Sequence, residues 1–352
     1  MSNNKKVDEL LSTMSQSLDQ VQTEKGLYDL LKPALDFDGP IRYDNRLPWT
    51  LALGGALLAL VLWGLPEGLF DGFLSLDLQW QLIELLRPLL TLPIPGWLPF
   101  VLLAVFGIWQ LFSRRSKLQG LADAIWKRNL LLDNNLREVQ GNPASQADEL
   151  EKRFCEFNRG NYKRTMDELY QGHYQGEQHS FDFQVFDFHY VDKRTSTYTD
   201  SNGKSRTRTT YHHYHRYGLV MDFGFTRSLN ILGFSTSGHR GLKWEPSSLD
   251  FRKAFKVLAG SEMEAARFLK PAVVERLERL AQGFSSPNLE FNAAGELCLT
   301  IANKDLIQVP RAGGLDQPKA FLESLKEETR LPLLDTLLDE VHFLMTHSDS
   351  NF

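Results

Sequence analysis

Two histidines in an alternating segment are the residues of this sequence best suited to chemistry. The segment 210–218 reads TYHHYHRYG, and His213 and His215 stand two positions apart. In a β-strand such residues point to the same face, so both imidazoles can approach one metal ion. The candidates for a third ligand on a facing strand are Asp187, His189 and His179. The pattern predicts a metal-dependent hydrolase or a metal sensor. The simpler interpretation is a solvated hairpin whose histidines and tyrosines pair across strands.

The same segment belongs to a strip of basic and aromatic residues. Such a strip suits anionic lipid headgroups, a nucleotide, single-stranded nucleic acid or an acidic protein partner. A formal net charge of -5 argues against a dedicated nucleic-acid binder, and the nearby membrane segments described below favour lipid or protein. A positively charged loop without a ligand is the alternative. The candidate binding residues are Arg206, Arg208, Tyr211, Tyr214 and Arg216.

Local catalytic signatures are absent from the sequence. It contains no HExxH, GxSxG or CxxC, and Gly203-Lys204-Ser205 lacks the earlier glycine of a phosphate-binding loop. The two cysteines, Cys155 and Cys298, stand far apart, which predicts reduced thiols. No cofactor and no catalytic residue is therefore predicted. A binding or scaffold module is favoured over an enzyme, although a site assembled from distant loops leaves no local motif.

An α+β domain with a mainly antiparallel sheet and flanking helices is predicted to hold these residues. Alternating residues from Phe181 and again over 211–225 flank Asp200-Ser-Asn-Gly203, a strong turn signal, and so predict a long hairpin. A helix is predicted over 261–282. Residues 317–346 are predicted to form two helices divided at Pro332. Further strands are predicted over 229–235, 255–259, 289–292, 296–301 and 305–310.

Two uncharged apolar runs precede this domain, at 47–66 and 93–113. Each has the roughly 20 residues that a helix needs to cross a bilayer core. Tryptophans stand near the ends of both runs, where indoles suit the membrane interfaces: Trp49, Trp63, Trp97 and Trp109. The runs predict a transmembrane hairpin, with a buried hairpin of a soluble core as the alternative.

Basic residues precede the first run and follow the second, whereas the loop between the two runs is mainly acidic. The positive-inside rule then places both termini in the cytoplasm. A short helix around Asp77–Leu89 is predicted in the outer loop, and a role in assembling an envelope complex is a third hypothesis for the protein. The flanking basic residues are Arg42, Arg46, Arg114, Arg115 and Lys117; the loop contains Glu67, Asp71, Asp77, Glu84 and Arg87.

Heptad-like spacing on both sides of the apolar runs predicts amphipathic helices. Asn129 would occupy a core position if the second helix pairs with another copy, giving a homo-oligomer through the stalk. The alternative is packing against the chain's own N-terminal helix or soluble domain. The spacing is carried by Val7, Leu11, Met14, Leu18 and Val21, and by Leu118, Ala122, Ile125, Asn129, Leu132, Leu136 and Val139. The predicted parts are an N-terminal helix over 1–46, the transmembrane hairpin over 47–113, a helical stalk over 114–170 and the α+β domain over 171–352.

The stretch 250–280, DFRKAFKVLAGSEMEAARFLKPAVVERLERL, resembles a bacterial membrane family catalogued as domain of unknown function 3137. The later strand Gly295-Glu-Leu-Cys-Leu and Tyr217-Gly218-Leu219 also fit it, as do the two apolar runs. The resemblance implies a multi-pass protein of the bacterial inner membrane. It implies no reaction and no catalytic residues. Its matching positions are Phe251, Phe255, Val257, Ala265, Leu269, Pro271, Arg276, Leu277 and Leu280.

Overall fold

The computed structural model describes residues 3–70, 72–73, 75–90, 95–199, 203–236, 238–302 and 304–348, except the side chains of residues 89 and 90. The chain forms two compact units. The first comprises Met1–Asn129 and Arg311–Glu328, and the second Leu130–Pro310 and Thr329–Phe352. The second unit therefore begins well before residue 171, and a late segment of the predicted α+β domain belongs to the first unit.

Two helices of the first unit, α3 (Arg46–Gly64) and α5 (Leu98–Asp133), are long and apolar enough to cross a membrane. They pack closely through small residues. A Cβ at Gly55 would lie 2.7 Å from the backbone oxygen of Phe100, and one at Gly107 would lie 2.6 Å from that of Pro48. Gly54, the neighbouring glycine of α3, has no atom within 4 Å of its Cβ position. The contact thus uses one small-residue face of α3.

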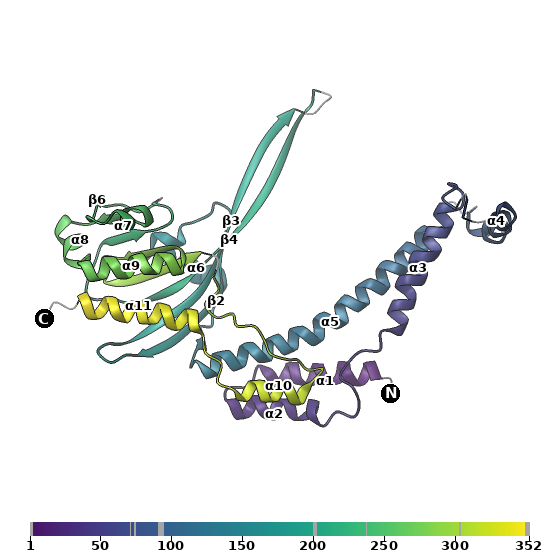
Figure 1. Cartoon of the computed structure of the whole chain (residues 1–352), viewed down its shortest axis with the longest axis horizontal. Coiled ribbons are helices and arrows are strands. Elements are labelled where there is room, and N and C mark those ends of the chain that lie inside the picture. The colour runs from purple at the N-terminus through teal and green to yellow at the C-terminus, as the bar shows by residue number, and fades with distance from the viewer. Residues whose placement is uncertain are drawn as a thin grey trace. The chain divides into compact units, whose positions relative to one another are not determined.

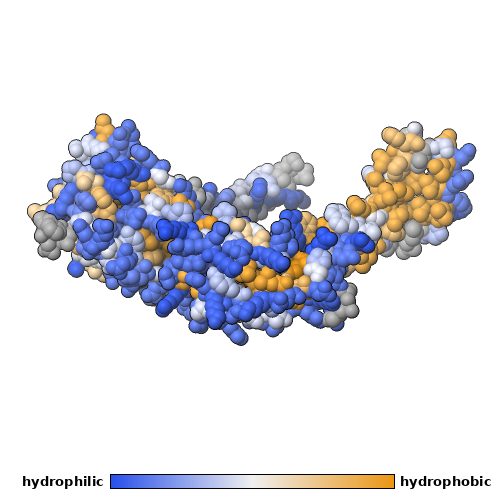
Figure 2. All heavy atoms as spheres, turned by 60° about the horizontal axis from the view of Figure 1, so that its bottom comes forward, coloured by the Kyte–Doolittle hydropathy of each residue, from blue (hydrophilic) through white to orange (hydrophobic). Residues whose placement is uncertain are grey.

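The remaining surface of these two helices is apolar and exposed. Only 33% of the most apolar window of α3 and 11% of that of α5 is buried, which differs from a helix in a soluble core. Figure 2 shows this hydrophobic cluster at one end of the first unit. Helix α4 (Leu76–Leu90) follows α3 and confirms the predicted helix of the loop; Trp80 and Leu85 on it are also exposed.

A polar-surfaced helical group completes the first unit. Helices α1 (Asn3–Leu18), α2 (Glu24–Leu35) and α10 (Pro318–Lys326) pack together with the later part of α5. The side chain of Arg128 donates from Nε to the backbone oxygen of Val21 at 2.8 Å. Asn129 is fully buried by residues of its own chain, which agrees with the alternative of packing within the chain. Pairing of the predicted stalk with a second copy stays a prediction.

The second unit is built on one antiparallel sheet, which has nine strands among the described residues. Their order is β1-β2-β3-β4-β9-β8-β5-β7-β6 (Figure 1). The α+β class and the antiparallel sheet are confirmed. The strands are β1 (Arg137–Glu138), β2 (Lys163–Gln175), β3 (Ser180–Thr199), β4 (Ser205–Asp222), β5 (Leu229–Leu232), β6 (Leu242–Trp244), β7 (Lys256–Ala259), β8 (Ser285–Phe291) and β9 (Glu296–Ala302).

Helices cover both faces of this sheet. Helix α6 (Pro143–Glu151) and the short η1 (Cys155–Phe157) pack on the face that carries Phe186 and Phe188. Helix α11 (Pro332–Ser348) lies on the opposite face, where Asp339 accepts a hydrogen bond from Tyr174. The other helices are α7 (Leu249–Ala254), α8 (Glu262–Phe268) and α9 (Pro271–Gly283), and α9 lies beside α11 in Figure 1.

Three predicted elements are wrong. The helical stalk does not run to residue 170: α5 ends at Asp133, because Asn135 takes φ +52° and Leu136 N donates back to Leu131 O at 2.8 Å. Strand β2 then occupies residues predicted as helix, since pairing with β1 and β3 outweighs local propensity.

The strand predicted over 305–310 is an irregular segment that bends at residues 306 and 307, where the Asp305 carboxylate accepts from Ile307 N at 2.9 Å. The helix predicted over 261–282 is two helices, because Pro271 starts α9. The division at Pro332 is confirmed. The predicted turn residues 200–202 and the first residues of the second apolar run, 93–94, lie outside the described residues.

Candidate functional site

The hairpin of β3 and β4 is confirmed and extends beyond the rest of the sheet (Figure 1). The two strands pair from Phe183 with Met221 to Thr199 with Ser205. Strand β2 accompanies β3 only to Val191, and β9 accompanies β4 only from Tyr217. In the described part of the chain, residues 192–199 therefore pair only with residues 205–212, and we call these two segments, together with the adjoining residues 213 and 214, the arm.

Where the ladder between β2 and β3 ends, the side chain of Asn161 makes the two backbone hydrogen bonds that a further residue of β2 would make. The Asn161 amide donates from Nδ2 to Lys193 O at 3.2 Å, and its Oδ1 accepts from Lys193 N at 2.7 Å. Beyond this point the arm holds itself together through its own ladder and through β-branched threonines such as Thr195 and Thr209, which suit strands. The arm thus offers two strand edges and two open faces.

Positive charge is concentrated on the arm. Residues 192–214 contain five basic and two acidic residues in a chain of net charge -5. Directly paired residues share one face of a hairpin, so the cross-strand pair Tyr198 and Arg206 lies on the same face as Arg208 and Tyr214, whereas Tyr211 lies on the other. The basic and aromatic strip predicted as one surface is therefore divided between two faces.

Tyrosines on both faces form contacts near the base of the arm. The rings of Tyr190 and Tyr214 stack at 5.2 Å, and those of Tyr162 and Tyr211 lie 4.9 Å apart. The ammonium of Lys193 lies 5.5 Å from the Tyr162 ring. Tyr211 is 47% exposed and Tyr214 is 38% exposed, so each still presents a large part of its side chain to a ligand.

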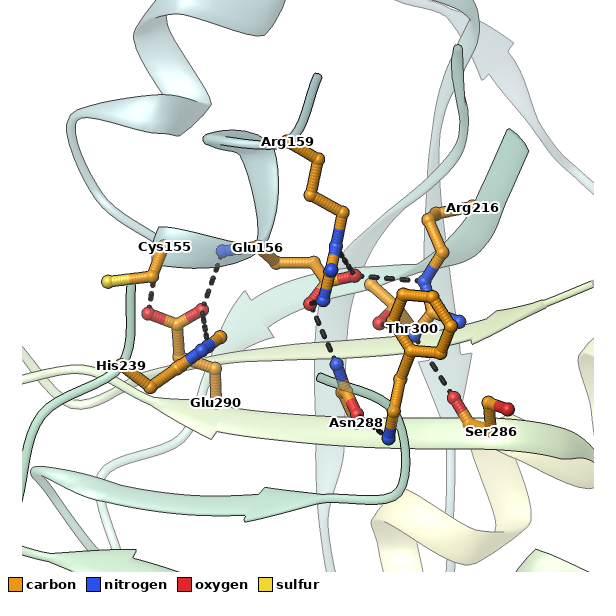
Figure 3. Close-up of polar contacts among 10 residues, drawn as sticks. Cys155, Glu156, Arg159, Arg216, His239, Ser286, Asn288, Glu290 and Thr300 are labelled. Atoms are coloured by element: carbon orange, nitrogen blue, oxygen red, sulfur yellow. Dashed lines mark hydrogen bonds and ion pairs between the residues drawn. The ribbon is translucent and has the colours of Figure 1, made fainter. Parts of the chain in front are cut away.

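Arg216 does not belong to this exposed surface, and its prediction as a binding residue is wrong. Its side chain is 1% exposed and extends from β4 toward Glu156 (Figure 3), and its guanidinium carbon lies 5.0 Å from the centre of the Phe234 ring. Nε donates to Glu156 Oε1 at 2.9 Å, and Nη2 donates to Thr300 Oγ1 at 2.7 Å and to Ser286 O at 3.1 Å. Arg216 therefore stabilises the base of the arm.

Glu156 is the centre of this buried network. Arg159 binds it through two hydrogen bonds of 2.8 and 2.7 Å, and Asn288 donates to it at 2.8 Å. Burial alone raises the pKa of the Glu156 carboxyl, but the guanidiniums of Arg216 and Arg159 and the Asn288 amide outweigh burial and hold the pKa at about 2. The carboxylate is thus the shared counter-ion of two arginines, which is a structural role.

A neighbouring group of Cys155, Glu290 and His239 superficially resembles a nucleophile with its base (Figure 3). Glu290 accepts from the backbone N of Cys155 at 2.7 Å and of Glu156 at 3.0 Å, and His239 Nε2 lies 3.2 Å from it. Burial and the Glu290 carboxylate raise the pKa of the Cys155 thiol to about 11. A reactive cysteine needs a lowered pKa, so this arrangement supports η1 and provides no nucleophile.

The histidines come together at the base of the arm, on the face opposite Arg216. His189 pairs directly with His215 across the strands, and their rings stack at 4.6 Å. His189 Nε2 lies 2.9 Å from His213 Nδ1. His215 Nδ1 lies 2.8 Å from Asp187 Oδ1. The structure thus brings together four of the residues singled out in the sequence.

His179 lies elsewhere, beside Phe225 and His342, and is not part of this cluster. The structure instead adds Asp167, whose Oδ2 lies 3.5 Å from His189 Nδ1. Asp167 occupies a β-bulge between Met166 and Glu168, which turns its carboxylate toward the histidines. Sequence reasoning missed it because this segment was predicted as helix: Met166, Leu169 and Tyr170 have helical spacing, and the buried positions of β2 do not alternate along the strand.

Several carboxylates lie around the cluster, and the ammonium of Lys163 also lies near His189. Burial raises the pKa of Asp187 to about 6, while the hydrogen bond from His215 acts in the opposite direction. Burial and the carboxylates of Asp187, Asp305, Glu168 and Asp167 raise the pKa of Tyr217 to about 12. Imidazoles within such a group of carboxylates form a suitable environment for a cation.

Comparison of the chain with protein-family models, with curated proteins and with solved structures found no match. The functional argument therefore rests on the geometry of the chain itself.

Proposed function

We propose that this protein is a membrane-anchored binding module of the bacterial inner membrane, which engages an anionic partner through the arm. Helices α3 and α5 cross the bilayer, and both termini lie on the cytoplasmic side. The exposed apolar surface of these helices supports the anchor. The orientation is supported by the basic residues before the first apolar run and after the second, which are Arg42, Arg46, Arg114, Arg115 and Lys117.

One observation carries the binding role: the arm concentrates basic and tyrosine side chains outside the packed core of an acidic protein. Arg206 and Arg208 are exposed, as are Tyr198, Tyr211 and Tyr214. A core hairpin gains nothing from this composition, whereas charge and aromatic faces bind anionic ligands. The open strand edges favour an extended acidic segment of a partner protein, which can add backbone hydrogen bonds to the ladder.

The test uses full-length protein in nanodiscs of uncharged phosphatidylcholine, with a poly-glutamate peptide and vesicles containing anionic lipid as separate probes. We expect the peptide to bind, with an affinity that falls as salt rises, and R206E/R208E to weaken binding at least tenfold. The matched control is K243E/K253E, which reverses two lysines with 70% and 76% exposed side chains outside the arm.

Each outcome has a distinct meaning. Loss of peptide binding in R206E/R208E but not in the control supports an acidic protein partner. If R206E/R208E loses binding to the anionic vesicles but not to the peptide, the arm binds lipid headgroups. Equal binding of both probes by wild type and R206E/R208E would refute a binding role for the arm.

A further inference from the structure

We infer that Asp167, His189 and His215 form a binding site for a divalent transition-metal ion of the Zn²⁺ class at the base of the arm. One ligand atom from each of these residues lies within 4.8 Å of the other two. The three residues come from β2, β3 and β4, so a bound ion would join three adjacent strands. This site does not depend on the binding role of the arm.

The chemistry of the donor set selects the class of ion. Two imidazole nitrogens and one carboxylate oxygen suit Zn²⁺, Fe²⁺ and similar ions, whereas Ca²⁺ and Mg²⁺ prefer oxygen alone. Three protein ligands also leave one tetrahedral position for water, as in catalytic zinc sites. The carboxylate of Asp187, which is hydrogen-bonded to His215, favours a cation further, as do Asp305 near it and Glu168, which pairs with Asp187 across the strands.

Hydrogen bonds already orient the ligands. Asp187 lies 2.8 Å from His215 Nδ1, which leaves Nε2 of that ring for the ion. Carboxylates commonly hold a metal-binding histidine in this way. Thr165 donates its hydroxyl to Asp167 Oδ1 at 2.9 Å, leaving the other carboxylate oxygen 3.5 Å from His189 Nδ1. The bulge, the hydroxyl and the second carboxylate together give the arrangement expected of a metal site.

A small rearrangement completes the coordination. Ligand atoms of a tetrahedral ion with bonds near 2 Å lie roughly 3.3 Å apart, so the present separations must shorten. The rings of His189 and His215 are within 12° of parallel, so one ring must turn to direct its nitrogen at a shared ion. The His215 side chain is 37% exposed and has room to turn.

The experiment measures metal bound to the full-length protein in detergent micelles, purified with a tag that contains no histidine. After treatment with a chelator, the protein is titrated with Zn²⁺ and, for its visible spectrum, Co²⁺. We expect one saturable equivalent per chain in the wild type. H189Q and H215Q should each lose it, and D187N should weaken it about tenfold or more. Zn²⁺ should also raise the Tm of the wild type but not of H189Q.

Two controls separate this site from general histidine binding. His212 stands on the same strand but on the opposite face, and His173 is exposed and pairs with Asp182. H212A and H173A should keep the full stoichiometry. Hydrogen exchange of β3 and β4 checks that H189Q and H215Q remain folded. The inference is overturned if the wild type binds no stoichiometric metal, if folded H189Q and H215Q bind as it does, or if the controls lose binding equally.

Discussion

Replacing Glu156 by glutamine should destabilise the second unit by about 3 kcal/mol. Glutamine resembles the protonated carboxyl in shape, so the cost follows from the preference of this site for the charged form. The pKa of Glu156 falls from 4.5 to about 2, and each pKa unit corresponds to about 1.4 kcal/mol. Removing one member of a buried ion pair costs a similar amount, about 3–5 kcal/mol, because the remaining charge is left uncompensated. Here that remainder is Arg216, which is 1% exposed, and Arg159.

Hydrogen exchange with mass spectrometry on the full-length protein can measure this loss, read from the slowest amides of β8 and β9. The control is R208E, which reverses an exposed arginine on the same strand and face as Arg216 and should change the free energy of unfolding by less than about 0.5 kcal/mol. R216M combined with E156Q should cost less than the sum of the single changes. A loss below about 1 kcal/mol in E156Q, or an equal loss in R208E, would refute the structural role of this network.

Three further outcomes are expected. Because the folded-state pKa of Glu156 lies below its unfolded value, its contribution to the free energy of unfolding should be complete above about pH 4.5 and decline as pH falls toward 2. A pH series in which the stability of E156Q falls as steeply as that of the wild type over this range would contradict this. In α3, G55I should separate α3 from α5, because even a Cβ there would lie 2.9 Å from Ala104 N. A cysteine pair that cross-links α3 to α5 in the wild-type background should fail to do so in G55I. The control G54I should leave the cross-link intact. Asn142 accepts hydrogen bonds from the backbone N of residues 144 and 145 at the start of α6. N142A should therefore lower the stability of α6, measured by hydrogen exchange, by about 1 kcal/mol. An unchanged value would show that the cap contributes nothing.

Local patterns were enough to predict the elements whose signal lies within one segment. Alternation and an Asn-Gly turn signal predicted the hairpin, and β3 and β4 pair from Phe183 with Met221 to Thr199 with Ser205. Two uncharged runs predicted the long apolar helices α3 and α5. Pro332 predicted the boundary before α11, because proline is accepted in the first turn of a helix but not in its interior. In each case the physical constraint is short in range.

The roles of individual side chains depended on partners distant in sequence. Arg208 and Arg216 are both basic and share one face of β4, yet one is exposed and the other buried, because Glu156 and η1 cover only the second. Asp167 reaches the histidines only because β2 pairs with β3 and bulges at that residue. Periodicity determines which face of a strand a residue occupies, whereas only tertiary packing decides whether that face meets solvent, a counter-ion or a cluster of possible metal ligands.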